Sequence, residues 1–315
     1  MSPKAHQRYE ESLKDLSIGC PTFHPDSVGL RPGHCGYFDD NGRWIHMLDL
    51  MNIDTDSCDY KPLAPPVPVV SSTGPHRWGP IFGSTVTSCG VEQVTNISIP
   101  GTPATTGWCL RFEKSADYGA VLMADPVTYA TFPHKAKFHK WCKDNAAALL
   151  SDETFGPEVR KRSFWIITEV YTSPRCSITY WDGSNKEMKI DISAEAWSAG
   201  KLTGGGFWTK STSAGSWRGY GFEQSGEGQD NQSYVIFYGG IEYKFSFIRA
   251  LLHPEEPFEI RRRGSTEDIP ELFGICIEGN FYSGEGGIRN LAKPIDVKQP
   301  EIATQDDQKL QNDGD

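Results

Sequence analysis

The sequence lacks the long apolar segments that direct proteins into or across membranes. Its first residues, 1–19, contain no apolar core of the length found in signal peptides. No run of about 18 apolar residues occurs, which is the length that a membrane-spanning helix needs. We therefore expect a cytoplasmic protein whose eight cysteines are reduced thiols.

The chain also has little positive charge. Its 31 Lys and Arg residues face 41 Asp and Glu residues, which gives a formal net charge of -10. A general nucleic-acid binder needs a basic surface to displace counterions from phosphates, so no nucleic-acid partner is expected. Residues 291–315 contribute to the acidity and contain few large apolar side chains, which predicts a mobile acidic tail.

No sequence motif of a known catalytic site occurs. The chain has no G-x-S-x-G nucleophile elbow, no G-x-x-x-x-G-K-[ST] phosphate loop and no H-E-x-x-H zinc motif. The cysteines lack the spacing of a zinc knuckle or a C-x-x-C pair. We predict no enzyme, no cofactor, and no catalytic or metal-binding residue. A Cys–His pair assembled only in three dimensions stays open as an alternative.

The patterns that are present favour strands. Within residues 33–50, Asp40-Asn41-Gly42 separates two strand-like flanks, and Asn-Gly predicts a tight two-residue hairpin turn. Residues 52–80 contain six prolines and are predicted to be loop. Residues 81–123 are rich in Thr, Val, Ile and Ser, which predicts further strands.

Two helices are predicted. Residues 7–16 can form a short helix. Residues 133–150 have the spacing of an amphipathic helix, with Phe138, Trp141 and Leu149 on its apolar face.

Strands return after this helix. Residues 164–171 and 175–181 are predicted to pair with each other across Thr172-Ser173-Pro174. Residues 186–192 and 241–247 alternate apolar and polar side chains, as half-buried strands do. Between these two alternating strands, residues 200–228 contain nine glycines, which predicts a long loop or a loose hairpin.

Together these patterns predict an α+β fold. We expect a twisted, mainly antiparallel β-sheet with long hairpins and a few flanking amphipathic helices. The predicted domain organisation is one α+β domain over 1–253 and a C-terminal extension over 254–315.

The order of these elements resembles the N-terminal pore-forming domain of the gasdermin family, in its fungal type. The resemblance covers about residues 105–250 and consists of patterns of residue class. It is carried by Phe164–Val170 followed by Cys176–Ile178, and by Tyr234–Tyr238 followed by Ile241–Phe245. A weaker match to the early strands is Gly36-Tyr37-Phe38, followed by Trp44 and by Asp49-Leu50.

The resemblance implies a pore-forming protein of regulated cell death. Such a protein stays inactive in the cytosol, moves to the plasma membrane when activated, and assembles there as a homo-oligomer on acidic phospholipids. The segment 254–315 would then be inhibitory, and a protease or a partner protein would activate the chain. The residues expected to enter the membrane are Met188, Ile190, Ile192, Phe207, Trp208, Trp217, Ile241, Tyr243, Phe245 and Phe247.

One region is basic although the chain as a whole is acidic. Residues 134–162 contain seven basic and four acidic residues, which gives a local net charge of +3. The seven basic ones are the candidate lipid-binding residues, Lys135, Lys137, Lys140, Lys143, Arg160, Lys161 and Arg162. A solvated helix face is the alternative interpretation.

Two other functions compete with pore formation. A cytosolic lectin-like module would use exposed Trp and Tyr to stack on sugars, and it would show clustered Trp on a concave face. An enzyme would show Cys, His and Asp converging in a pocket.

Overall fold

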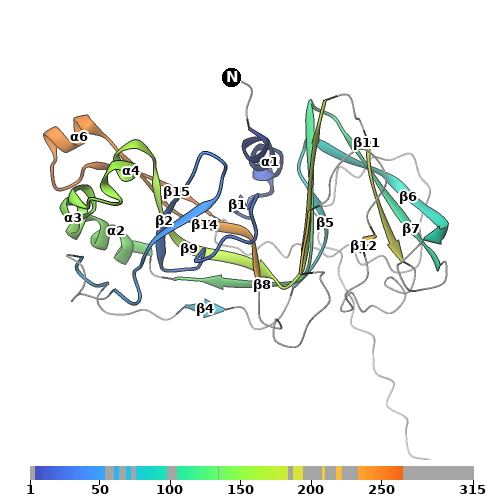
Figure 1. Cartoon of the computed structure of the whole chain (residues 1–315), viewed down its shortest axis with the longest axis horizontal. Coiled ribbons are helices and arrows are strands. Elements are labelled where there is room, and N and C mark those ends of the chain that lie inside the picture. The colour runs from blue at the N-terminus through green and yellow to red at the C-terminus, as the bar shows by residue number, and fades with distance from the viewer. Residues whose placement is uncertain are drawn as a thin grey trace, which may run out of the picture.

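We analysed the protein in a computed structural model (Figure 1). The structure describes residues 4–53, 60–63, 69–71, 76–97, 105–133, 135–183, 187–193, 208–209, 218–221 and 233–264. Phe207, Trp217, most of the glycine-rich segment and the acidic tail lie outside the described residues.

The described elements are mostly strands. In chain order they are α1 (Ala5–Leu13), the 3-10 turn η1 (Lys14–Leu16), β1 (Cys20–Pro21), β2 (His34–Phe38), β3 (Trp44–Asp49), β4 (Val70–Ser71), β5 (His76–Phe82), β6 (Val86–Ile97), β7 (Thr105–Lys114), β8 (Tyr118–Thr131), α2 (Lys135–Asp144), α3 (Ala146–Ser151), α4 (Gly156–Lys161), β9 (Phe164–Ser173), β10 (Cys176–Asp182), β11 (Glu187–Ser193), β12 (Trp208–Thr209), β13 (Arg218–Tyr220), β14 (Tyr234–Phe245), α6 (Phe247–Leu252) and β15 (Phe258–Arg263). The predicted β-rich α+β class is confirmed.

The described strands form two sheets. The larger sheet has the order β1-β14-β9-β8-β10-β13. In addition, β15 pairs with β14, β2 pairs with β9, β3 pairs with β2, and β4 and β5 pair with β8. The smaller sheet has the order β12-β11-β7-β6. The described strand pairs are antiparallel, as predicted.

The strand pairs of the two sheets share one register. The described pairs of β7 with β11 and of β8 with β10 and β9 keep it from Gly107–Ser193 to Thr131–Glu169, with a gap between Glu113–Glu187 and Tyr118–Asp182. Pro126 and Pro174 fall opposite each other in this register, at the gap between the β8–β9 and β8–β10 pairs. Proline has no N–H to donate, so the two opposed prolines interrupt the ladder, and the chain bends at residues 174–175 between β9 and β10.

The predicted pairing of 164–171 with 175–181 is therefore wrong. β9 and β10 lie end to end along β8 and do not pair with each other. Pro174 interrupts the hydrogen bonds but does not reverse the chain, because both halves find a partner in the 14-residue strand β8.

The two alternating strands also do not form one hairpin. β11 pairs with β7 and β12 in the smaller sheet, whereas β14 pairs with β1, β9 and β15 in the larger sheet. The alternation marked each strand as half-buried, but alternation does not specify which strand is the neighbour.

Two shorter predictions need adjustment. The predicted turn at Asn41-Gly42 is present, but it is a longer connection in which the Asp39 N–H donates to the Arg43 carbonyl at 2.9 Å. The region predicted to be loop, 52–80, includes β4 and the start of β5, which pair with β8.

The predicted helix 133–150 is present as two helices. It breaks at the buried residue Asn145, between α2 and α3. The Asn145 side chain donates to the Trp141 carbonyl at 2.9 Å and accepts the Lys61 N–H at 2.6 Å. The Asn145 N–H still donates to the Trp141 carbonyl at 3.0 Å, and the Asn145 carbonyl accepts the Leu149 N–H at 2.9 Å. The axis turns because the Asn145 backbone, at φ -114° and ψ 4°, departs from helical values, and the side-chain bonds hold it there.

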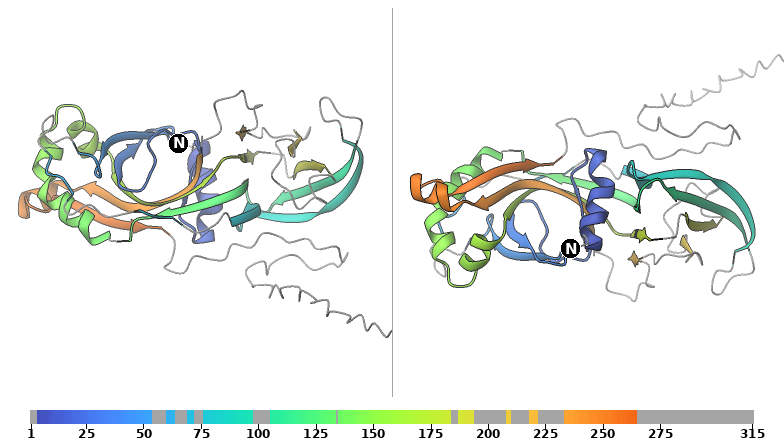
Figure 2. Two further views of the ribbon diagram at one scale, coloured as in Figure 1. Left: turned by 90° about the horizontal axis from the view of Figure 1, so that it is seen from below. Right: turned by 90° about the horizontal axis from the view of Figure 1, so that it is seen from above.

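The helices gather at one end of the molecule. Figures 1 and 2 show α2, α3, α4 and α6 at one end, the smaller sheet at the other, and α1 between them. The helical end has its own core, which contains Phe132, Phe138, Leu149, Phe164 and Phe258.

The boundary between residues 253 and 254 falls inside this body. β15 pairs with β14 over six residues, and the Phe258 side chain is buried in the core. The described body therefore extends to Gly264, eleven residues beyond the predicted boundary. The sequence did not predict this strand because four of its six residues, Glu259 and Arg261–Arg263, are charged. Only Phe258 is buried, so the strand has no apolar periodicity.

Candidate functional site: the helical end

The helical end carries the predicted lipid-binding residues on α2 and α4. Helix α2 buries Phe138, Trp141 and Cys142 against the core, and helical periodicity places Lys140 and Lys143 on the outside. Helix α4 is fixed by the buried Val159, which leaves Arg160 and Lys161 exposed.

Several of these cations contact acidic neighbours. Lys140 Nζ lies 2.6 Å from Asp144 Oδ2, and Lys143 Nζ lies 2.9 Å from Glu256 Oε1. Lys135 Nζ is 3.9 Å from the buried Glu169 carboxylate. Exposed ion pairs contribute little stability, so the pairs of Lys140 and Lys143 with these partners cost little to break.

Arg162 differs from the other six candidates. It donates to both Asp40 carboxylate oxygens, at 2.7 and 3.1 Å, and to Glu158 Oε2 at 2.7 Å. Its side chain is only 19% exposed. Hydrogen bonding to Arg162 lowers the pKa of the Asp40 carboxyl. Arg162 thus fastens α4 to the β2–β3 turn. Arg160 donates to the Leu150 carbonyl at 2.5 Å, which ties α4 to α3.

The described residues among those predicted to enter the membrane lie in three places: the core of the helical end, strand β11 and helix α6. Ile241 and Tyr243 are buried in the core of the helical end, and Phe245 packs against it. Met188 is buried in β11, at the opposite end. The side chains of Ile190, Ile192 and Trp208 lie outside the described residues, as do Phe207 and Trp217 entirely.

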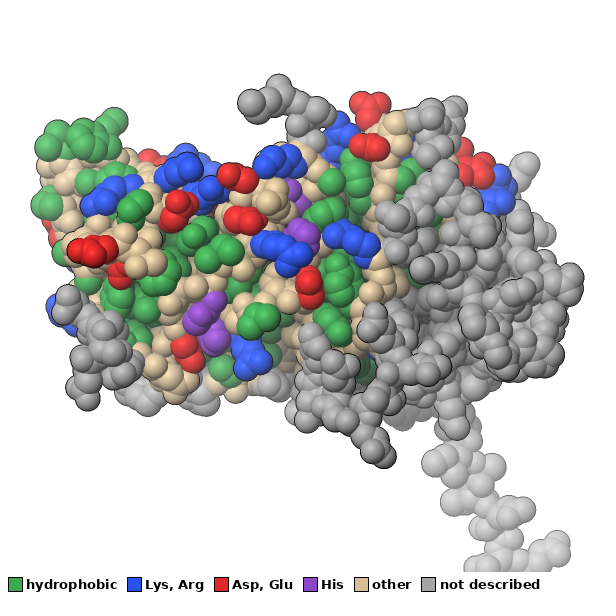
Figure 3. Space-filling view, viewed as in Figure 1, with side chains coloured by type: hydrophobic (Ala, Val, Ile, Leu, Met, Phe, Trp, Pro, Cys, Tyr) green, Lys and Arg blue, Asp and Glu red, His purple; other side chains and the backbone are tan. Residues whose placement is uncertain are grey.

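Only Phe247 among the described candidates is strongly exposed, and it belongs to a helix. Helix α6 presents four large apolar side chains, Phe247, Ile248, Leu251 and Leu252, which are 67–74% exposed. Figure 3 shows this apolar patch at the tip of the helical end, with Lys and Arg side chains nearby. The alternation over 241–247 predicted a strand, so this helical patch was not predicted. The spacing of the apolar residues in FIRALL was the signal that could have indicated a helix.

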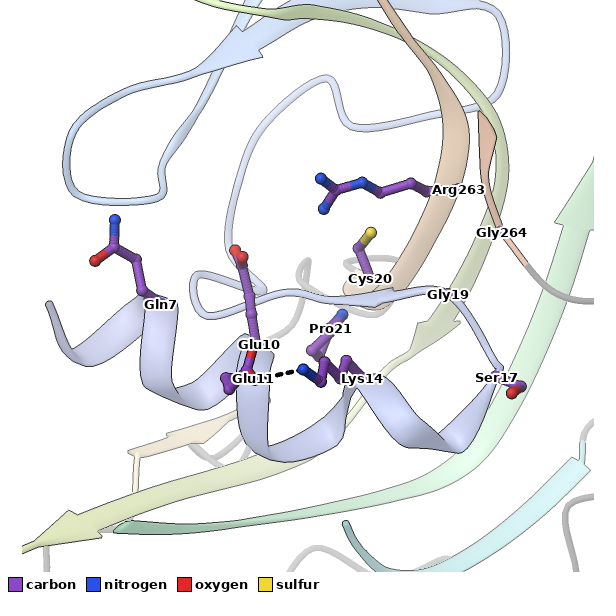
Figure 4. Close-up of a pocket in the computed structure, with 10 residues that line it drawn as sticks. All are labelled: Gln7, Glu10, Glu11, Lys14, Ser17, Gly19, Cys20, Pro21, Arg263 and Gly264. Atoms are coloured by element: carbon purple, nitrogen blue, oxygen red, sulfur yellow. Dashed lines mark hydrogen bonds and ion pairs between the residues drawn. The ribbon is translucent and has the colours of Figure 1, made fainter. Parts of the chain in front are cut away.

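A second feature is an open hollow of about 510 Å³ beside α1, shown in Figure 4. Glu10 of α1, Cys20 of β1 and Arg263 of β15 line it. Burial raises the pKa of the Cys20 thiol to about 11 and the pKa of the Glu10 carboxyl to about 7. A protonated thiol is a poor nucleophile, so this hollow lacks the activated cysteine that the enzyme hypothesis requires.

The remaining described thiols are similar. Burial raises the pKa of Cys35, Cys142 and Cys176. In the part of the chain that the structure describes, no group of His, Cys, Asp and Glu side chains is arranged to hold a metal ion.

The lectin hypothesis required exposed tryptophans on a concave face. Four of the nine Trp side chains are described, Trp44, Trp141, Trp165 and Trp181, and all four are at most 6% exposed. They therefore pack the interior and do not form a sugar-stacking surface.

Comparison with known proteins gives no family: no family model matches the chain, and no curated protein matches it. None of the helices within the described ranges is long and apolar enough to cross a membrane.

Proposed function

We propose that the protein binds membranes containing acidic phospholipids and permeabilises them as a homo-oligomer, by inserting the strands of the smaller sheet as long hairpins. The proposal follows the gasdermin resemblance in its mechanism. It differs in the strands that enter the bilayer, which are β6, β7 and β11 and do not include β14.

The observation that carries the proposal is the register of β7 and β11. Apolar residues pair with apolar ones, as Met188–Phe112, Ile190–Leu110 and Ile192–Trp108. The intervening pairs, such as Glu187–Glu113 and Lys189–Arg111, are mostly polar. Arg111 also reaches diagonally to Glu187, at 2.6 Å. Strands that cross a bilayer alternate in this way, with one face toward lipid and one toward water.

Strand length supports the same assignment. A membrane strand needs about 9–11 residues. β6 has 12 residues and β7 has 10, which meet this length, whereas β11 has 7 in the described state and must lengthen on insertion. β6 also ends the sheet order β12-β11-β7-β6, and a strand at the end of a sheet is where a second copy can add its own strand.

The apolar pairs of β7 and β11 form a row of side chains, and part of this apolar row is buried in the described state. Phe112 and Met188 are 2% and 0% exposed. Activation must therefore uncover this row, and we propose that the segment after Gly264 controls the step, by cleavage or by displacement by a partner.

Dye release from vesicles tests the proposal. A protease site inserted after Gly264 allows the folded full chain to be tested before and after cleavage. We expect release from vesicles that contain phosphatidylserine or cardiolipin, greater after cleavage, and little release from phosphatidylcholine vesicles.

A matched pair of variants locates the membrane strand. Ile190→Glu places a charge in the apolar row, which costs about 2–4 kcal/mol at the midplane of a bilayer for a basic residue and less for an acidic one. Lys189→Glu changes the neighbouring polar row. We expect at least a tenfold loss of dye release for Ile190→Glu and near-normal release for Lys189→Glu, with circular dichroism confirming that both fold. No release from any chain, cut or uncut, contradicts the proposal.

A further inference from the structure

Helix α6 exposes more apolar surface than its place in the fold requires. None of its six residues is buried, and its four large apolar residues follow the spacing i, i+1, i+4, i+5, which places them along one side of the helix. The other large apolar residues that are exposed in the described ranges lie outside this helix, at Val28, Val69, Val70 and Ile260.

Hydrogen bonds hold the helix in place. The Ser246 hydroxyl caps it by accepting the Arg249 N–H at 3.4 Å, and the Ser246 N–H donates to the Pro257 carbonyl at 2.9 Å. Arg249 donates to the Glu256 carbonyl at 3.3 Å, and the Glu256 carboxylate also binds Lys143 of α2. These hydrogen bonds place the apolar side chains on a formed helix that is connected to α2 and to the segment before β15.

The size of the patch marks a contact surface. The patch lies on the tip of the molecule, as Figures 1 and 3 show. Four side chains of this size expose roughly 450 Å² at the observed fractions. A standard protein interface has about the same apolar area on each partner, so the area fits a protein or a bilayer and the surrounding charge decides between them.

The surrounding charge favours an anionic surface. Residues 135–162 carry +3, and residues 246–263, with four basic and three acidic side chains, carry +1. The whole chain carries -10, so the positive charge is concentrated at the end that bears the patch. Within it, Lys140 is 77% and Arg249 43% exposed.

We propose that α6 docks the helical end on an anionic lipid bilayer. Its four apolar side chains enter the interfacial region, while Arg249 of α6 and Lys140 and Lys143 of α2 contact the headgroups. An apolar face combined with nearby cations is how interfacial helices bind membranes. The inference rests on the proposed function and names the element that makes the first contact. Docking requires no movement of the smaller sheet, so it precedes permeabilisation.

Vesicle flotation of the uncleaved full chain tests the proposal. The probes are vesicles of phosphatidylcholine alone and vesicles that contain about 30 mol% phosphatidylserine. The variant is Leu251→Ser/Leu252→Ser, which changes only exposed side chains and so leaves the fold intact. The matched control is Val28→Ser, because Val28 is 88% exposed and lies outside α6.

We expect the full chain to float with the phosphatidylserine vesicles and to bind the neutral ones weakly. The double variant should lose about tenfold or more of its partition coefficient, since two leucines no longer gain from leaving water. Val28→Ser should remain within about twofold of the unchanged protein, because a lone exposed valine makes a small contribution.

The remaining outcomes separate this inference from the proposed function. Equal flotation of the double variant and the unchanged protein overturns the docking role of α6. The docking role is also overturned if the unchanged chain does not float. It is overturned as well if the chain forms a concentration-dependent dimer that the double variant abolishes, because the patch then binds a second copy. Flotation that depends on Leu251 and Leu252 without any dye release supports docking and contradicts only the pore.

Discussion

At the scale of single residues, the hollow beside α1 shows how burial changes chemistry without creating a catalytic site. Glu10 and Cys20 lie near Arg263, yet burial outweighs this cation and raises the pKa of both acidic groups. The thiol stays protonated at neutral pH. The carboxyl titrates near neutrality, so the protonation of Glu10 is linked to folding.

This linkage predicts that stability falls as the pH rises. The pKa of Glu10 is about 7 in the folded chain, against an ordinary value of 4.5. Between these pH values the folded chain holds a proton that the unfolded chain releases. The free energy of unfolding should therefore decrease from pH 4.5 to pH 7, by up to about 3 kcal/mol from this group.

Urea unfolding at pH 5 and pH 7.5 measures the effect, with Glu10→Gln as the comparison. The glutamine variant has no proton to release. Its stability advantage over the unchanged protein should be larger at pH 7.5 than at pH 5. An equal difference at both pH values would show that Glu10 does not carry the dependence.

At the scale of elements, local sequence patterns predicted the secondary structure of most segments, but they did not predict which strands pair with one another. The sequence predicted strands at β9, β10, β11 and β14 and a helical segment at α2–α3. It paired β9 with β10 wrongly and specified no partner for β11 or β14, because period-two alternation defines a buried face but not a neighbour. It also missed α6, because six apolar-rich residues after a strand are ambiguous between strand and helix.

The helix break at Asn145 carries a prediction at this scale. Asn145 is 2% exposed and connects α2 to the 60–63 segment through the Lys61 N–H. Asn145→Ala should destabilise the fold by about 1–3 kcal/mol, because the Lys61 N–H loses its acceptor. The Trp141 carbonyl loses one of its two donors and keeps the Asn145 backbone N–H.

Chemical denaturation compares this variant with Lys140→Ala on the same helix. The Lys140 side chain is 77% exposed, and its ion pair with Asp144 contributes little. We expect a change below about 0.5 kcal/mol for this control. Equal effects of the two substitutions would mean that Asn145 does not fix the junction of α2 and α3.

At the scale of the whole molecule, the functions proposed above fall on its two ends. The described pairs from Gly107–Ser193 to Thr131–Glu169 share one register across the smaller sheet and the larger sheet. We propose that the helical end docks on the bilayer and that the smaller sheet enters it.

The extent of this body can be tested by truncation. A chain ending at residue 253 loses β15 and with it Phe258, which is 4% exposed in the core of the helical end. Removing a buried Phe side chain costs about 3–5 kcal/mol, and the β14 edge loses its partner as well. We therefore expect a large drop in thermal midpoint, or aggregation, for the chain ending at 253. A chain ending at Gly264 should unfold close to the full-length midpoint. Similar melting of the two truncations would restore the boundary at 253.

The sequence by itself determined the composition-level facts: a β-rich α+β chain, an acidic average with a basic segment at 134–162, and no motif of a known catalytic site. These depend on residue type and local spacing, which the sequence states directly. Only the tertiary structure decided that β9 and β10 continue one strand and that β11 pairs with β7. It also placed β15 in the main sheet and brought α6 to the same end as the basic helices. Each of these depends on contacts between residues far apart in the chain, and strand pairing over such distances leaves no local pattern to read.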